Sequence, residues 1–135
     1  MASKLFVDTS FVIALVNEND QYHSQAQALS RKFEDSLLIT TDAVLLEIGN
    51  ALARDFRSDA VEIIRVLRSS KNVQVVEVDT ALFRKGFAVY EKYDDKEWGL
   101  VDCISFVVMW ERELTEVLTF DGDFHQAGFV AAKAS

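Results

Sequence analysis

Acidic side chains recur in this chain directly after short apolar stretches. Asp8 follows Leu5-Phe6-Val7, and Asp121 follows the stretch 116–119 within two residues. In open parallel sheets, ligands bind in the crevice beyond the carboxyl ends of the strands. Carboxylates gathered at that edge suit a divalent cation, because hard cations prefer oxygen ligands, and a bound cation can then meet a phosphate group.

Two further acids interrupt segments that are otherwise apolar and helical. Asp102 stands between Leu100-Val101 and Cys103-Ile104, and Glu47 stands in the apolar run 43–48. A carboxylate in the first turn of a buried helix needs a partner or a cation. Acids also suit helix N-termini, both as caps and electrostatically. Periodicity alone therefore leaves two interpretations open, a shared acidic site and ordinary helix starts.

The elements that would position these acids alternate along the chain. Apolar spacing predicts strands over 4–7, 37–40, 73–78, 116–119 and 129–132. Helices are predicted over 10–16, 21–33, 43–55, from a cap at Ser58 or Asp59, over 80–93 and over 101–112. We interpret Asp42 and Asp79 as helix-start residues. The alternation predicts an α/β fold, a three-layer α/β/α sandwich around a mostly parallel sheet of about five strands.

Size and composition bound the class of protein. With 135 residues, we expect a single domain over residues 1–135. No apolar run reaches the ~18 residues of a membrane span, and the N-terminus does not resemble a signal peptide. One cysteine fits a reducing cytoplasm, where we expect the protein to act. The net charge of −8 argues against broad nonspecific binding to nucleic acid, but not against a nuclease that holds cations.

Four motifs together resemble a known family. They are Asp8-Thr9-Ser10, the stretch Leu46-Glu47-Ile48-Gly49-Asn50, the stretch 98–106 around Asp102, and Leu118-Thr119-Phe120-Asp121-Gly122-Asp123. Their order and spacing are similar to those of the PIN-domain ribonucleases, and more narrowly of the VapC-type toxins of prokaryotic toxin–antitoxin pairs. The resemblance covers essentially the whole chain and implies a PIN-like fold.

The resemblance also implies an activity, a metal-dependent endoribonuclease that uses Mg²⁺ or Mn²⁺. The family's acidic positions correspond to Asp8, Glu47, Asp102 and Asp121, with Asp123 as an additional acid. We expect Asp8, Asp102 and Asp121 to bind the metal and Glu47 to bind or orient the attacking water. Supporting positions match Thr9, Ser10, Asn50 and Thr119. Many relatives place Ser or Thr shortly before the third acid, whereas this chain has Gly99-Leu100-Val101 there, so Asp102 must be positioned in another way.

The chemistry explains why such a site needs a cation. Carboxylates that converge within a few ångströms repel one another, and some of them would stay protonated without a cation. A divalent cation removes this conflict and makes a bound water easier to deprotonate, which suits hydrolysis of an RNA phosphodiester.

The resemblance further implies partners. They are an RNA substrate, a cognate small antitoxin that inserts a basic side chain among the acids, and a second copy in a homodimer packed through helices. The basic residues between Arg54 and Lys71 could contact the RNA or could form an ordinary solvated helix surface. The sequence leaves both interpretations equally open. We expect Trp98 in the core, Cys103 buried and inert, and His23 at the surface.

Two other classes of protein compete with this interpretation. One is another Mg²⁺-dependent phosphoryl-transfer domain, but a phosphatase of the haloacid-dehalogenase type needs an Asp at position 10, where this chain has Ser. A receiver domain needs an acidic pair on its first strand, which is also missing. The other class is a non-catalytic PIN-fold binding module, against which the presence of all four acids counts.

Overall fold

The computed structural model describes residues 3–135, and its centre is a five-stranded parallel sheet. The strands are β1 (Lys4–Val7), β2 (Leu37–Thr41), β3 (Val73–Val76), β4 (Glu116–Leu118) and β5 (Val130–Ala131). Their spatial order is β3-β2-β1-β4-β5, and every pairing is parallel. Leu5, Phe6 and Val7 are almost completely buried, as expected for a central parallel strand that is covered on both faces.

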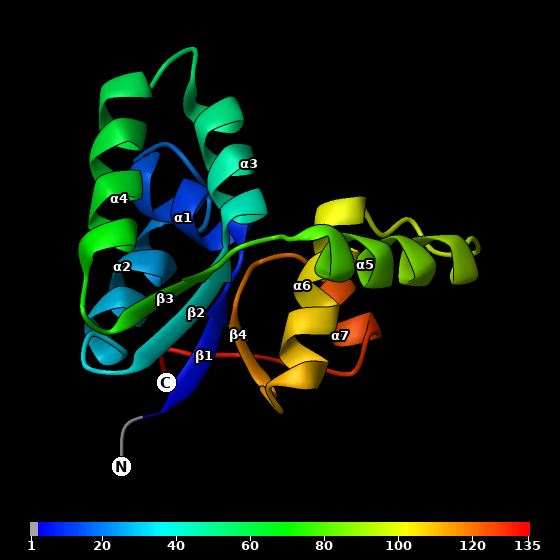
Figure 1. Cartoon of the computed structure of the whole chain (residues 1–135). Helices are drawn as coiled ribbons and strands as arrows, with labels where there is room; N and C mark the ends of the chain where they lie inside the picture. Colours follow the sequence, from blue (N-terminus) through cyan, green and yellow to red (C-terminus); the bar gives the residue numbers. More distant parts are fainter. Residues whose placement is uncertain (1–2) are drawn as a thin grey trace.

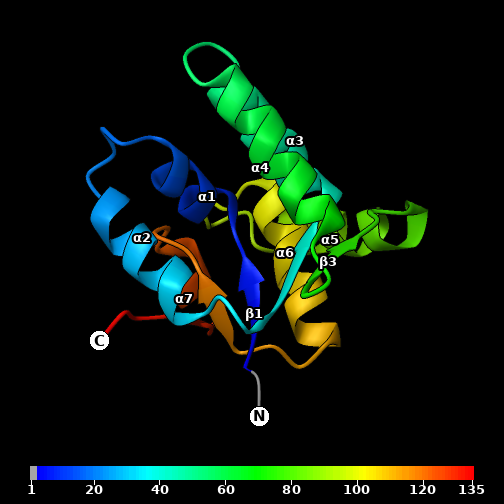
Figure 2. The same cartoon turned by 90° about the vertical axis from the view of Figure 1, so that its left-hand side faces the viewer.

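Helices cover both faces of this sheet. They are α1 (Thr9–Val16), α2 (His23–Lys32), α3 (Asp42–Leu52), α4 (Arg57–Ser69), α5 (Thr80–Lys92), α6 (Leu100–Glu111) and α7 (Asp123–Gln126). α1 to α4 lie on one side and α5 to α7 on the other (Figure 1). Figure 2, turned by 90°, shows α2 and α6 on opposite sides of β1. The predicted three-layer sandwich is confirmed. Within residues 3–135, no helix is both long enough and apolar enough to cross a bilayer.

The strand order creates a switch point beside β1. From β1 the chain continues outward to β2 and β3, and it later returns to the other side of β1 as β4 and β5. Phe6 pairs with Val117 and Val7 with Leu118, and the Asp8 amide donates a hydrogen bond to the Leu118 carbonyl over 3.1 Å. This register brings the residues that follow β1 and β4 together at the carboxyl edge of the sheet, which is the expected ligand site in such folds.

Side-chain caps fix where α3 and α5 begin. The Thr41 hydroxyl accepts a hydrogen bond from the Val44 amide, and the Asp79 carboxylate accepts one from the Leu82 amide. Asp42, the first residue of α3, accepts a hydrogen bond from the Val78 amide and so ties α3 to the segment after β3. Asp42 and Asp79 therefore have structural roles, as predicted.

The predicted start of α4 was wrong. The N-cap is Phe56 rather than Ser58 or Asp59, and α4 begins at Arg57. Phe56 packs against the core and its amide donates to the Leu52 carbonyl, so the chain turns from α3 into α4 within a few residues. Asp59 lies instead in the first turn of α4, where the helix dipole favours a negative charge.

Several large apolar residues of the helices lie at the surface. Phe83, Phe87 and Tyr90 of α5 are each 46% exposed, and Leu46 of α3 is 70% exposed. The three aromatic rings stack along α5 with centroid separations of 6.3 and 6.4 Å. Helical spacing identified these positions as one face, but it does not distinguish a face that packs within the chain from one that stays uncovered.

Two helical glycines provide a matched test of how closely the helices pack. A Cβ atom at Gly86 of α5 would lie 3.1 Å from the Cα atom of Ile104 on α6 and would overlap that residue's side chain, whereas at Gly49 it would meet only an Ile64 methyl at 3.8 Å. We expect Gly86→Ala to destabilise the fold by about 1–3 kcal/mol through overpacking. Gly49→Ala should instead stabilise it by up to about 1 kcal/mol through helix propensity. Urea denaturation of both variants checks this, and equal effects of the two would contradict the close α5–α6 contact.

Candidate metal-binding active site

Asp8 occupies the base of the site, at the end of β1. It is the N-cap of α1, its side chain is buried, and one carboxylate oxygen, Oδ2, receives all of its side-chain hydrogen bonds. The hydroxyls of Ser10 and Thr119 each donate to that oxygen over 2.8 Å. Burial raises the pKa of Asp8, and these hydrogen bonds oppose the rise by stabilising the carboxylate.

Hydroxyl groups connect Asp8 to the segment that follows β4. The Ser10 and Thr119 oxygens are 3.1 Å apart, and the Ser10 hydroxyl also accepts a hydrogen bond from the Phe120 amide over 2.9 Å. The Thr119 hydroxyl accepts one from the Asp121 amide over 3.0 Å. Two parts of the chain separated by more than 100 residues are therefore held in one hydrogen-bonded network, which fixes Asp121 relative to Asp8.

Three carboxylates converge beside this network. One oxygen from each of Asp102, Asp121 and Asp123 lies within 4.8 Å of the others. Asp121 accepts a hydrogen bond from the Asp123 amide over 2.9 Å, so the turn after β4 presents both acids to the same region. Asp102 comes from the first turn of α6, where its carboxylate accepts a hydrogen bond from the Gly99 amide over 3.3 Å.

The Gly99 contact positions Asp102 without a capping hydroxyl. Gly99 is the N-cap of α6, its carbonyl accepts from the Cys103 amide, and its own amide donates back to the carboxylate three residues ahead. In a capping box, a glutamate at the third helical position accepts a hydrogen bond from the amide of the N-cap residue, and Asp102 takes that role here. The backbone of Gly99 thus helps to position Asp102 although this region has no capping hydroxyl.

The electrostatics of the cluster favour uptake of positive charge. Burial, followed by the charges of Asp8 and Asp121, raises the pKa of Asp102 to about 7. Burial and the neighbouring Asp121 also raise the pKa of Asp123. Like charges at this spacing destabilise the ionised forms, and a cation bound between them removes that penalty.

The fourth predicted acid, Glu47, is linked to Thr9, the residue after Asp8, and is not part of the cluster of Asp102, Asp121 and Asp123. The Thr9 hydroxyl donates to the Glu47 carboxylate over 2.6 Å, so α3 is connected to the start of α1. Asn50, one turn later on α3, is exposed, and its side chain makes no hydrogen bond with residues 3–135. Its proposed support of the site stays a prediction.

The remaining sequence predictions near the site have mixed outcomes. Trp98 is buried and donates to the Gln126 side chain over 3.0 Å, as expected for a core residue. Cys103 is buried, and burial raises its pKa to about 11, so the thiol is unreactive at neutral pH. His23, expected at the surface, is partly exposed, and its Nδ1 lies 2.8 Å from the Ala14 carbonyl oxygen.

One contact had no signal in the sequence. The rings of Tyr22 and Phe120 stack with a centroid separation of 4.6 Å and an angle of 3°. Phe120 lies between Thr119 and Asp121, so this stack holds the turn after β4 against the segment that leads into α2. Because the two residues are far apart in sequence and follow no shared periodicity, only the folded structure pairs them.

The donor set fits a hard divalent cation. Carboxylate oxygens from Asp102, Asp121 and Asp123 are all oxygen ligands, and the nearby hydroxyls contribute no soft donor. Three ligands from an open edge of the sheet leave room for waters, which Mg²⁺ retains when it binds to proteins. The sequence prediction placed Asp8 among the ligands and treated Asp123 as an additional acid, whereas the geometry groups Asp123 with Asp102 and Asp121.

The hydroxyl of Thr119 offers a direct test of this network. Thr119→Val removes the hydrogen bond to Asp8 and the one from the Asp121 amide while keeping the side-chain shape. We expect a loss of about 1–3 kcal/mol in stability, because buried polar groups lose their partners. The affinity for Mn²⁺, measured by calorimetric titration, should fall by about 10–100-fold, as when a ligand's supporting contact is removed. Thr119→Ser, which keeps the hydroxyl, is the control, and equal behaviour of the two variants would refute the network's role.

The fold and this acid-lined edge define a class of protein. The PIN-domain family model matches residues 5–130, and the chain belongs to the PIN-domain family. The chain is 33% identical over 129 residues to the 23S rRNA-specific endonuclease VapC20 of two Mycobacterium tuberculosis strains. That match covers 96% of this chain and 98% of VapC20. The predicted family is therefore confirmed.

Solved structures agree with the sequence comparison. The crystal structure of Mycobacterium tuberculosis VapC20, described as a sarcin-ricin loop cleaving toxin, matches with a TM-score of 0.87 and 32% identity. It covers 96% of this chain and 98% of that one. FitAcB from Neisseria gonorrhoeae matches with a TM-score of 0.65 at 13% identity, which supports the fold alone.

Proposed function

We propose that this protein is a metal-dependent endoribonuclease, the toxin of a toxin–antitoxin pair, that hydrolyses RNA phosphodiester bonds with Mg²⁺ or Mn²⁺. The observation that carries the proposal is the convergence of Asp102, Asp121 and Asp123 within 4.8 Å beside the buried Asp8. Such a centre suits phosphate chemistry, because its cation offsets the charge of the phosphate and lowers the pKa of water. The relationship to VapC20 supports the same activity.

We propose a separate role for each group of residues in the site. Asp102, Asp121 and Asp123 would hold the cation, and Asp8, which receives the hydrogen bonds of two hydroxyls on one oxygen, would keep its other oxygen available to the cation or its waters. Glu47, which accepts a hydrogen bond from Thr9, would orient the attacking water and accept its proton. Ser10 and Thr119 hold Asp8 and the turn carrying Asp121 in register.

The substrate class follows from the relative. VapC20 is named as specific for 23S rRNA and described as cleaving the sarcin-ricin loop. We assign large-subunit ribosomal RNA to this chain as its substrate and the cytoplasm as its place of action. The alternative that the fold retains is a non-catalytic binding module, which would hold the same partners without cutting RNA.

The test uses purified protein with intact ribosomes, transfer RNA and messenger RNA in Mg²⁺ or Mn²⁺. We expect one discrete cut in the large-subunit RNA, mapped by primer extension, and none in the other RNAs. Cutting of transfer RNA alone would retain the nuclease and reject the substrate. No cutting of any RNA by folded, partner-free protein would favour the binding module.

The proposed antitoxin would act through charge. An acidic site whose like charges raise the pKa of Asp102 also favours a basic side chain. We propose a small partner protein that places an Arg or Lys among the acids and blocks cleavage. Replacing that basic residue of the partner by Ala should restore cleavage even while the partner stays bound.

The proposed homodimer has a suitable surface on α5. Phe83, Phe87 and Tyr90 are each 46% exposed and form one stacked row, whereas monomers seldom leave large apolar patches uncovered. We propose that two copies pair through helices and cover this row. Light scattering should give twice the chain mass for the parent, and a single-copy mass would reject the dimer.

A further inference from the structure

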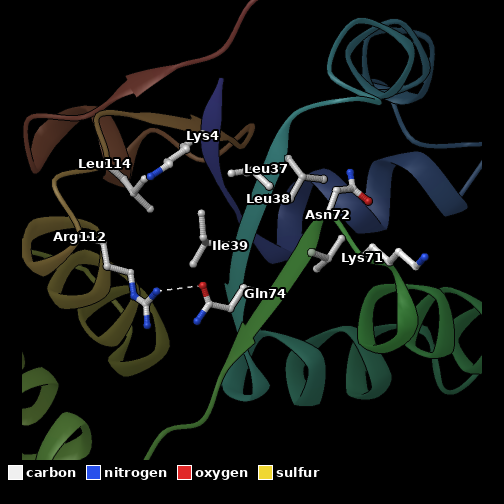
Figure 3. Close-up of a pocket in the computed structure, with 10 residues that line it drawn as sticks. Lys4, Leu37, Leu38, Ile39, Lys71, Asn72, Gln74, Arg112 and Leu114 are labelled. Carbon is white, nitrogen blue, oxygen red and sulfur yellow. Dashed lines mark hydrogen bonds between the residues drawn. The ribbon is translucent and has the colours of Figure 1, made fainter. Parts of the chain in front are cut away.

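A hollow at the opposite end of the sheet from the acids is lined by basic and apolar side chains. It lies where β1, β2 and β3 begin and where α6 ends, and its volume is about 270 Å³. Figure 3 shows Lys4 and Arg112 on one side of it and Gln74 between Arg112 and Ile39. Among residues 3–135, no carboxylate lines the hollow, although the chain as a whole carries a net charge of −8.

The positive charges of the hollow are not neutralised within the described chain. Lys4 and Arg112 form no ion pair with a carboxylate of residues 3–135. Arg112 instead donates to the Gln74 amide oxygen over 3.0 Å, which holds the guanidinium over the sheet (Figure 3). Lys71 lines the far rim, where its ammonium group extends away from the hollow in the same view. A cationic wall without acids suits an anion, and guanidinium groups suit phosphate in particular.

The floor of the hollow is apolar. Leu37 and Ile39 of β2 present their side chains on the same face of the sheet as Lys4, and Leu114 closes the side toward β4. The volume lies just below the range of roughly 300–1,000 Å³ that holds drug-sized ligands. One nucleotide matches both features, with its base on the apolar strands and its phosphate on Lys4 and Arg112.

The hollow lies within reach of RNA bound at the acids. Lys4 and Asp8 mark the two ends of β1, which separates the sites by about 13 Å at ~3.3 Å per residue. α6 connects them too, because Asp102 is in its first turn and Arg112 is its C-cap. About four stacked nucleotides, at ~3.4 Å each, span this distance.

We propose that this hollow binds a nucleotide of the RNA substrate, several positions away from the bond that is cut. The inference rests on the proposed ribonuclease function and deepens it. Such an anchor favours a folded RNA that reaches both sites over a short fragment that reaches only the acids.

The experiment measures RNA binding in an Asp8→Asn background, which prevents turnover. Fluorescence anisotropy compares Lys4→Gln/Arg112→Gln with a control of equal charge change, Arg31→Gln/Lys133→Gln, both exposed and outside the hollow. For a large-subunit RNA hairpin, we expect about tenfold weaker binding by the hollow variant. The salt slope of its binding should fall by about 1 for each phosphate that the variant no longer binds. A dinucleotide cannot span the two sites, so the difference in affinity between the two variants should be smaller for it than for the hairpin.

The outcomes separate this inference from the function on which it rests. If the hollow variant and the control bind the hairpin with equal affinity and salt slope, the anchor is rejected, while metal-dependent cleavage by the parent still supports the nuclease. If the parent neither binds nor cleaves the hairpin or any other RNA, the proposed function fails, and the anchor fails with it.

Discussion

Asp121→Asn should lower the rate of RNA cleavage by at least about 10³-fold, since removal of one charged ligand costs several kcal/mol at ~1.4 kcal/mol per tenfold in rate. The physical reason lies in the position of the carboxylate. Asp121 belongs to the cluster with Asp102 and Asp123, and its amide is tied to Thr119. Asn keeps the oxygen that accepts from the Asp123 amide, so the turn should stay folded. Single-turnover cleavage of large-subunit RNA at saturating Mg²⁺ is the measurement.

A surface acid provides the control for this prediction. Asp35→Asn makes the same chemical change at an exposed position outside the cluster, and it should leave the rate unchanged. Calorimetric titration with Mn²⁺ should show weaker binding by Asp121→Asn and parental binding by Asp35→Asn. If Asp121→Asn cleaved RNA at the parental rate, this carboxylate would have no part in the chemistry.

Asp102→Asn should stabilise the metal-free protein while it abolishes cleavage. The pKa of Asp102 is raised from 3.8 to about 7 in the folded protein, so the folded state binds more protons than the unfolded state between these values. Stability contributed by this carboxyl is complete below pH ~4 and is lost as the pH rises to ~7. The Asn side chain does not ionise, so the variant keeps this part of the free energy of unfolding. We expect the difference from the parent to be about 2 kcal/mol after allowance for solvent screening of a partly exposed group. Its amide oxygen can still accept from the Gly99 amide.

Denaturation with urea in EDTA, from pH 4 to pH 8, measures this effect. The two proteins should unfold at similar urea concentrations near pH 4, and the variant should become the more stable as the pH approaches 7.5. Added Mg²⁺ should then stabilise the parent by about 2.7 kcal/mol at one hundred times the dissociation constant, and the variant by much less. A difference in stability that did not change with pH would show that repulsion at Asp102 is not its cause.

The order of elements was predictable because local patterns determine it. A continuous apolar run such as Leu5-Phe6-Val7 marks a buried strand, and helical spacing such as that of Val44 and Ile48 marks the buried side of a helix. Both patterns can be seen within a few neighbouring residues of the sequence. The helix starts at Thr41 and Asp79 follow from capping chemistry within three residues. The start of α4 failed because Phe56 packs against the core, and a tertiary contact outweighed the better caps at Ser58 and Asp59.

The candidate site was predictable only in part for the same reason. The motifs indicated Asp8, Asp102 and Asp121, but the grouping of Asp123 with the last two depends on a turn geometry that the residue types do not specify. The stack of Tyr22 on Phe120 and the basic hollow around Arg112 depend on contacts between elements far apart in sequence. Whether Phe87 packs or stays exposed depends on the direction that α5 takes after β3. Figure 1 shows this direction, and helical periodicity does not specify it.

The most direct measurement is the cleavage rate of large-subunit RNA by purified protein as Mg²⁺ or Mn²⁺ is added after EDTA, with Asp8→Asn beside the parent. Asn is a good N-cap, so the variant should keep α1 in place. We predict discrete fragments that appear only with the metal and only with the parent. Fragments that persist in EDTA, or that Asp8→Asn produces at the parental rate, would contradict a metal centre built on these acids.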